Sequence, residues 1–121
     1  MAEGRAPSAK RTAAEKRGRA GETLAALYLR LKGYRILAQR VRTPVGEIDL
    51  IAEKSGIVAF VEVKARRRAN AALGAVTLHA WNRISRAADH WMAKHPRYSD
   101  HGWRYDIIAI APSRLPVHLR D

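Results

Sequence analysis

The 121-residue sequence contains no cysteine. Disulfide bridges and thiolate metal sites are therefore excluded, and a reducing compartment is permitted. No apolar run is long enough to span a bilayer, and the basic N-terminus lacks the apolar segment of a secretory signal peptide. These absences predict a cytoplasmic, soluble protein.

Several catalytic signatures are also missing. The sequence has no glycine-rich phosphate loop, nucleophile elbow or internal repeat, so nucleotide hydrolysis and serine-hydrolase chemistry have no support. The five histidines show neither HExxH nor another zinc-binding spacing. These histidines, which we interpret as structural or surface residues, are His79, His90, His95, His101 and His118.

Acidic residues are scarce relative to basic ones. The chain has 23 Lys and Arg against 11 Asp and Glu, which gives a formal net charge of +12. Such an excess favours a polyanionic partner, because phosphates bound by basic side chains release their counterions. Nucleic acid is the leading candidate, with ribosome association and an anionic membrane surface as alternatives.

The chain length predicts a single domain, residues 18–121, preceded by a basic, mobile N-terminal arm at residues 1–17. Within the domain, helical and strand patterns alternate in the manner of an α/β layer fold. The expected order is helix, three strands, helix and strand, with a short additional strand near the C-terminus. The corresponding segments are residues 17–32, 34–42, 45–52, 57–64, a helix starting near Thr77, and 103–111.

The first helix carries two apolar strips. Leu24, Leu27, Tyr28 and Leu31 follow the helical repeat, and a second strip consists of Ala25, Ala26 and Leu29. Glu22 lies one turn before the second strip and is therefore expected to face protein or a cleft. The alternative is that Glu22 is a first-turn acid that stabilises the helix dipole.

The next two strands read as a hairpin. If Ser55 and Gly56 form a two-residue loop, counting outward places Asp49 opposite Glu62, and Glu47 opposite Lys64. Strict alternation also places Ile48 on the same face as Leu50 and Ala52. Like charges directly opposite each other in a sheet are destabilising, so the pairing of Asp49 with Glu62 requires compensation.

Two arrangements compensate this repulsion. A divalent cation is one, because carboxylate oxygens are the ligands that Mg²⁺ and Mn²⁺ prefer. A salt-bridge network with Lys64 and the following arginines, Arg66, Arg67 and Arg68, is the other. Those arginines are also candidates for binding phosphates.

In the second helix, Trp81 and Trp91 are at helical spacing and are expected in the core rather than stacked on bases. Its predicted outer face consists of Asn82, Arg83, Arg86 and Lys94. Asp106 is the single acid of the strand that follows, and we expect it to orient a neighbour or cap a loop.

The order of these motifs resembles a known family. GExLAALYL at residues 21–29, GEIDLIA at 46–52 and VAFVEVKAR at 58–66 are similar to the YraN-type family of small bacterial proteins, as are GYRIL at 33–37 and RYDIIAIA at 104–111. That family is grouped with the PD-(D/E)xK nuclease superfamily. The resemblance implies a three-layer, restriction-endonuclease-like α/β fold with a mixed central sheet flanked by helices.

The resemblance also implies roles for individual residues. Asp49, Glu62 and the backbone carbonyl of Val63 match the superfamily's ligands for Mg²⁺ or Mn²⁺. Lys64 matches the lysine that positions the attacking water. Glu22 matches a helix acid that completes the site in Holliday-junction resolvases, which favours a site role for it. Glu47 and Asp106 are candidate supporting residues.

We therefore expect a metal-dependent endonuclease that hydrolyses DNA phosphodiester bonds, with branched or structured DNA as its substrate. A homodimer is compatible with this expectation. One alternative is a catalytically silent module that binds nucleic acid or the ribosome. The other is a structural or interaction protein in which the same acids form a salt-bridge network.

Overall fold

The computed structural model describes the backbone of residues 9–65 and 78–120 and the side chains of residues 19–65 and 81–120. These residues form two α-helices, a short 3₁₀ helix and five strands. In chain order they are α1 (Ala9–Leu31), β1 (Arg35–Thr43), β2 (Gly46–Lys54), β3 (Ile57–Ala65), α3 (Leu78–Lys94), η2 (Pro96–Tyr98), β4 (Gly102–Ile110) and β5 (Val117–Arg120).

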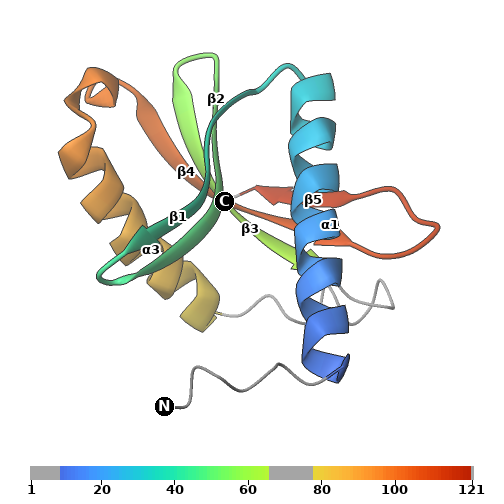
Figure 1. Cartoon of the computed structure of the whole chain (residues 1–121). Coiled ribbons are helices and arrows are strands. Elements are labelled where there is room, and N and C mark those ends of the chain that lie inside the picture. The colour runs from blue at the N-terminus through green and yellow to red at the C-terminus, as the bar shows by residue number, and fades with distance from the viewer. Residues whose placement is uncertain (1–8, 66–77, 121) are drawn as a thin grey trace, which may run out of the picture.

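The five strands form one mixed sheet in the order β1-β2-β3-β4-β5. Strands β3 and β4 are parallel and the other neighbours are antiparallel. Helix α1 packs on one face of the sheet and α3 on the other, which gives three layers (Figure 1). The predicted α/β class and element order are confirmed, and the suggested C-terminal strand is present as β5.

The hairpin between β2 and β3 has the predicted two-residue loop. Ser55 and Gly56 have φ values of 53° and 77°. Positive φ at both central residues is the geometry that matches the twist of a tight hairpin. Lys54 pairs with Ile57, and the ladder continues to Leu50 and Val61. The predicted register is therefore correct over this range.

Helix α1 extends further toward the N-terminus than the predicted range of residues 17–32. It begins at Ala9, so part of the segment assigned to the N-terminal arm is helical. Residues 9–17 contain neither Gly nor Pro, which agrees with their helical state. The alanine-rich strip faces the sheet, whereas Leu24, Leu27 and Leu31 are 41%, 50% and 79% exposed.

Close packing explains why the smaller strip faces inward. A Cβ atom added to Gly21 would lie 2.9 Å from the Cβ of Ala65, closer than real carbon atoms approach. Near Gly21 the helix therefore lies so close to β3 that only a small side chain fits between them, and Ala25, Ala26 and Leu29 continue this strip in the core. Size, rather than hydrophobicity alone, decided which strip packs on the sheet.

On the opposite face, α3 packs as predicted. Trp91 is buried against Phe60 with ring centroids 5.8 Å apart, and Trp81 is partly buried against the same cluster. All four residues predicted for the outer face of α3 are exposed. No helix within the described ranges is long and apolar enough to cross a membrane.

Candidate active site

The candidate site lies where β2 and β3 separate. The last pair in their ladder is Leu50 with Val61, immediately before Asp49 and Glu62. Beyond that pair the Asp49 side chain substitutes for a main-chain partner, because its Oδ2 accepts a hydrogen bond from the N–H of Val63 at 2.7 Å. The carboxylate thus lies between the two strands instead of projecting from one face.

This separation corrects one sequence-based prediction. Leu50 packs in the core beneath α1, but Ile48 packs with the residues beneath α3. Ile48 and Leu50 therefore do not share a face, as strict alternation predicted. The strand turns at Asp49, and the turn brings the apolar side chain of Ile48 under α3.

Strand β1 is also irregular beside Asp49. Its pairs with β2 include Gln39 with Leu50 and Val41 with Ile48, which leaves Arg40 across from Asp49. Arg40 has a φ of 54°, in the left-handed region that is uncommon for a residue other than glycine. Backbone strain of this kind persists only where surrounding structure enforces it, and it is concentrated at functional sites.

The environment of Asp49 disfavours its negative charge. Burial raises the pKa of this carboxyl from 3.8 to about 6, and the nearby carboxylates of Glu22 and Glu62 act in the same direction. The hydrogen bond from Val63 and the positive charge of Lys64 oppose the increase but do not cancel it. At neutral pH the ionised carboxylate is therefore held at a cost in free energy.

Glu62 is only partly compensated. Its Oε1 accepts a short hydrogen bond from Nη2 of Arg83 on α3 and lies 3.5 Å from Nζ of Lys64. Its other oxygen, Oε2, is buried and has no hydrogen-bond partner among the described residues. Because nearly all buried polar atoms in proteins are hydrogen-bonded, this oxygen is an unused acceptor that requires an explanation.

Glu22 reaches the same region from α1. Its side chain is 19% exposed and accepts a hydrogen bond from Nε of Arg40 at 2.8 Å. Its charge contributes to the raised pKa of Asp49. We call Glu22, Asp49 and Glu62 the carboxylate cluster; it combines residues from α1, β2 and β3.

The other predicted site residues lie elsewhere or outside the described ranges. Glu47 is exposed and forms an ion pair with Arg42 at 3.8 Å. The expected pairing of Glu47 with Lys64 is not part of the β2–β3 ladder, which ends at Leu50 and Val61. Asp106 is fully buried in a separate network. The segment Arg66 to Arg68 lies outside the described residues. Val63 contacts the cluster through its N–H, which donates to Asp49.

Two residues of the site were not predicted from the sequence. Arg40 and Arg83 each pair with one carboxylate of the cluster, although they lie on β1 and on the outer face of α3. Their side chains are about half exposed, at 50% and 43%. No spacing in the sequence links either arginine to its acid, because each contact joins segments 18 or 21 residues apart.

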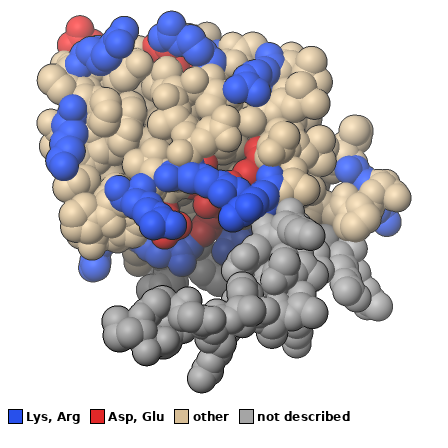
Figure 2. Space-filling model, in the orientation of Figure 1, with Lys and Arg blue, Asp and Glu red and all other residues tan. Residues whose placement is uncertain are grey.

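The surface reflects the same pairing of charges. On the face shown in Figure 2, Asp and Glu atoms are visible next to and beneath Lys and Arg side chains. Among the described residues, Glu22 pairs with Arg40 and Glu62 with Arg83. The acids are thus set within a basic surface of the kind that attracts phosphates.

The carboxylate oxygens of the site could supply some, but not all, of the ligands of a hard divalent cation. Among residues 19–65 and 81–120, no three His, Asp or Glu side chains form a group arranged to hold a metal ion. Asp49 and Glu62 supply two carboxylates, one with the unpartnered Oε2. Mg²⁺ commonly uses one or two protein carboxylates and completes its octahedron with water and substrate oxygens. The two acids are compatible with that mode of binding.

Comparison with known sequences places these residues in a family. Residues 21–110, which include the carboxylate cluster and Arg83, match the description "Uncharacterised protein family UPF0102". A UPF0102 protein of Chelativorans sp. (strain BNC1) is 51% identical over 111 residues, 92% of this chain and 90% of its own. One from Agrobacterium fabrum is 52% identical over 114 residues, 94% of this chain and 93% of its own. The chain belongs to the UPF0102 family.

Proposed function

We propose that this protein is a metal-dependent endonuclease of the PD-(D/E)xK superfamily that hydrolyses DNA phosphodiester bonds, with branched or structured DNA as its substrate. One observation carries the proposal. Asp49 and Glu62 lie together where the β2–β3 ladder ends, and their negative charges are incompletely compensated, with one buried oxygen of Glu62 unpartnered.

Asp49 and Glu62 would hold Mg²⁺ or Mn²⁺, with the carbonyl of Val63 as a further ligand. The bound cation supplies Lewis-acid chemistry: it lowers the pKa of water and neutralises charge on phosphate oxygens. The carboxylates are positioned by main chain and side chain together. The N–H of Val63 holds Asp49, and Arg83 pairs with Glu62 where no cation is bound.

Lys64 would orient the attacking water. Its Nζ lies 3.5 Å from Glu62 Oε1, and its side chain is only 19% exposed. A fixed cation in a partly dehydrated site stabilises the charge that develops during in-line attack and costs little reorganisation.

Arg40 and Arg83 would bind phosphates on either side of the scissile bond. Both guanidinium groups are half exposed and now pair with site acids. Exchange of a carboxylate partner for a phosphate keeps each arginine neutralised, because both partners are anions, and both can accept bidentate hydrogen bonds. The ion pairs therefore hold the acids in place before substrate binds.

A second function has specific support. Arg83 and Lys64 already neutralise one oxygen of Glu62, as expected if the acids belong to a salt-bridge network. A catalytically silent module that binds nucleic acid or the ribosome would use the basic surface alone. It would bind nucleic acid in a salt-sensitive manner and show no metal-dependent turnover.

The two functions are separated by cleavage of a radiolabelled four-way DNA junction in Mg²⁺ or Mn²⁺. The proposal predicts cleavage by the wild type and a loss of at least about a hundredfold in Asp49→Ala and Lys64→Ala, since each removes a group that acts in the transition state. Lys54→Ala, at the far end of the hairpin, is the matched control and should cleave normally. Cleavage that is unaffected by Asp49→Ala and Lys64→Ala would refute the endonuclease proposal.

A further inference from the structure

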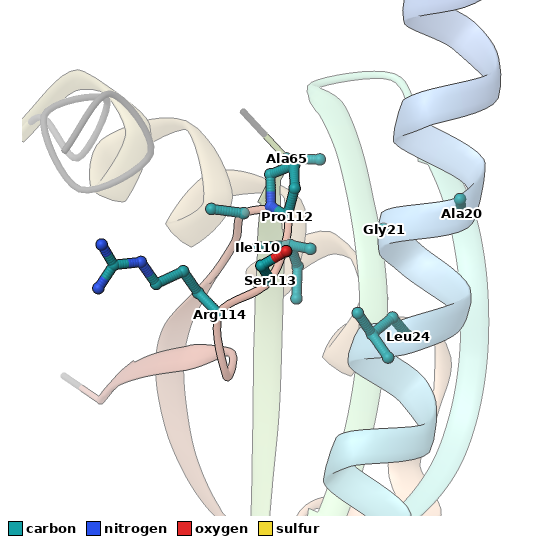
Figure 3. Close-up of a pocket in the computed structure, with 9 residues that line it drawn as sticks. Ala20, Gly21, Leu24, Ala65, Ile110, Pro112, Ser113 and Arg114 are labelled. Carbon is teal, nitrogen blue, oxygen red and sulfur yellow. The ribbon is translucent and has the colours of Figure 1, made fainter. Parts of the chain in front are cut away.

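Two hollows in the described part of the protein have similar volumes, about 290 Å³ each, but different chemistry. One lies between α1 and the loop that joins β4 to β5; its lining is small or aliphatic, and the guanidinium of its one charged residue, Arg114, extends outward (Figure 3). The other, which we call the Trp103 pocket, combines an indole ring and a carboxylate with aliphatic groups. It is lined by Asp89, Met92, Ala93, Ser99 and Trp103.

Trp103 supplies an accessible aromatic surface. It is the second residue of β4 and is 41% exposed. Its ring also packs against Phe60, with the two ring centroids 6.1 Å apart, so the indole is held against the core. The face of an indole ring carries a negative potential and attracts cations. The pocket therefore contains a fixed aromatic platform for a cationic group.

Asp89 adds a negative charge that the described part of the protein leaves uncompensated. It is exposed on α3, and its carboxylate forms neither an ion pair nor a hydrogen bond with any described residue. Arg86, one turn earlier on the same helix, does not pair with it. Five other described acids each pair with a basic residue: Glu22, Glu47, Glu53, Glu62 and Asp106. In a chain with 23 Lys and Arg against 11 Asp and Glu, the Asp89 carboxylate is thus available to a cation from outside the chain.

The fold itself contains a guanidinium bound by these two kinds of partner. Arg104 donates to Asp106 at 2.8 Å, and its guanidinium carbon lies 5.9 Å from the ring centroid of Tyr34. An arginine can do both because its guanidinium is planar: it stacks on an aromatic face and donates hydrogen bonds to a carboxylate. The Trp103 pocket offers the same two partners, an aromatic ring and a carboxylate, without a described arginine in place.

The pocket is separate from the carboxylate cluster. Trp103 pairs with Val58 on β3, and Glu62 lies four residues further along that strand, a distance of about 13 Å. Along α3, Asp89 follows Arg83 by six residues, or about 9 Å. A partner at the Trp103 pocket therefore leaves the cluster accessible. Because Asp89 repels phosphates, the pocket suits a protein better than a nucleic acid.

We propose that the Trp103 pocket binds an arginine side chain of a partner protein, with the guanidinium stacked on the indole and paired with Asp89. The aliphatic stem of the arginine packs on Met92 and Ala93. The pocket shares no residue with the carboxylate cluster, so the inference does not depend on the endonuclease proposal. The net charge of +12 repels a basic partner at long range. Binding at the pocket therefore comes from these short-range contacts.

The test is a ¹H–¹⁵N NMR titration of the full-length wild type with the peptide acetyl-GSRSG-amide, and with a matched peptide in which citrulline replaces arginine. Citrulline keeps the shape of the side chain and removes its charge. The arginine peptide should shift the indole N–H of Trp103 and the amide of Ala93 in a saturable manner. The citrulline peptide should bind at least about fivefold more weakly, because it loses both the cation–π contact and the ion pair.

Two pairs of variants control for charge and folding. Asp89→Asn should weaken binding of the arginine peptide about fivefold, whereas Glu47→Gln, which removes an exposed acid elsewhere, should not. Ala93→Arg places a competing cation at the pocket from an exposed helix position and should abolish binding. Ala20→Arg makes the same change at an exposed position of α1 and should leave binding unchanged.

Equal affinity for the two peptides, no saturable shift with the arginine peptide, or binding that survives Asp89→Asn and Ala93→Arg would overturn the inference. Pocket signals that move on dilution of the protein alone would assign the pocket to a second copy of the chain instead. Signals that move with a single-stranded DNA 12-mer but not with the arginine peptide would assign it to a nucleobase. Both outcomes would also overturn the inference, and none of them bears on cleavage of the four-way junction.

Discussion

Two acidic sites in this small protein differ in how fully their charges are compensated. Asp106 on β4 has no exposed surface, yet every part of its carboxylate is hydrogen-bonded. Arg104 donates from Nε and Nη2 at 2.8 and 2.9 Å, and His118 donates from Nε2 at 2.7 Å. Tyr34 and Lys32 extend the network, through contacts to Arg104 and to Nδ1 of His118.

The carboxylate cluster is the opposite case. Burial works against ionisation at Asp106 too, but the hydrogen bonds from His118 and Arg104 outweigh it and hold the pKa of that carboxyl below its usual value. At Asp49 the effect of burial exceeds that of the opposing hydrogen bond and positive charge, and the pKa rises to about 6. Glu62 keeps a buried oxygen without a partner.

The difference separates structural acids from candidate catalytic ones. The Asp106 network connects the segment between α1 and β1 with β4 and β5, and it leaves no described polar atom of Asp106 unsatisfied, so it stabilises the fold. In the carboxylate cluster, the ionised form of Asp49 lowers the stability of the fold in the absence of a ligand. Uncompensated carboxylates with a raised pKa are a recognised mark of functional sites.

The largest expected effect comes from breaking the satisfied network. Asp106→Ala should lower the free energy of unfolding by about 3–5 kcal/mol, because it leaves the partly buried guanidinium of Arg104 without its carboxylate partner. Urea denaturation at pH 7 measures this loss. The pKa of Asp106 is lower in the folded than in the unfolded protein. The ionised carboxylate therefore stabilises the fold above the unfolded-state pKa, and this stabilisation is lost as pH falls through the folded-state pKa. A loss below about 1 kcal/mol at pH 7 would show that the network does not stabilise the fold.

Asp49→Asn should have an effect of opposite sign. The pKa of Asp49 is about 6 in the folded protein, above the ordinary value of 3.8. Ionisation of Asp49 therefore lowers the free energy of unfolding as pH rises from the ordinary pKa through the folded-state pKa. Asparagine keeps the acceptor for Val63 but carries no charge. At pH 7.5 the variant should be more stable than the wild type by roughly 1–2 kcal/mol, and the two should converge at pH 4. Denaturation at both pH values checks the prediction; a variant that is less stable at pH 7.5 would contradict it.

A smaller effect on stability is expected for Arg83→Gln. Its ion pair with Glu62 is half exposed, so the free energy of unfolding should change by no more than about 1 kcal/mol. Loss of this competing cation should tighten Mn²⁺ binding a few fold while weakening binding to DNA. Arg35→Gln, which removes the exposed partner of Glu53, is the control and should leave Mn²⁺ binding unchanged. Weaker Mn²⁺ binding in Arg83→Gln would indicate that the arginine only supports Glu62.

The hairpin could be predicted because its information is local. Ser55 and Gly56 fix the loop, and the loop fixes the register as far as Leu50 and Val61. The inward direction of Glu22 was also predictable, since it follows from helical spacing relative to the alanine strip.

Features set by tertiary packing could not be predicted. The side chain of Ile48 lies on the α3 face because β2 and β3 separate at Asp49. The hydrophobic periodicity of the sequence does not indicate this separation. The exposure of Leu24 and Leu27 follows from the close approach of Gly21 to Ala65, a contact between distant segments. Arg83 reaches Glu62 from a helix face that its sequence pattern marks as exposed.

The most direct test of the central claim is isothermal titration of Mn²⁺ at pH 7.5 into the wild type, Asp49→Asn and Asp106→Asn. The account predicts binding by the wild type, loss of binding in Asp49→Asn, and binding retained in Asp106→Asn as long as that variant is folded. Wild-type protein that binds no Mn²⁺, or an Asp49→Asn variant that binds it equally well, would contradict the assignment of Asp49 and Glu62 as a metal site.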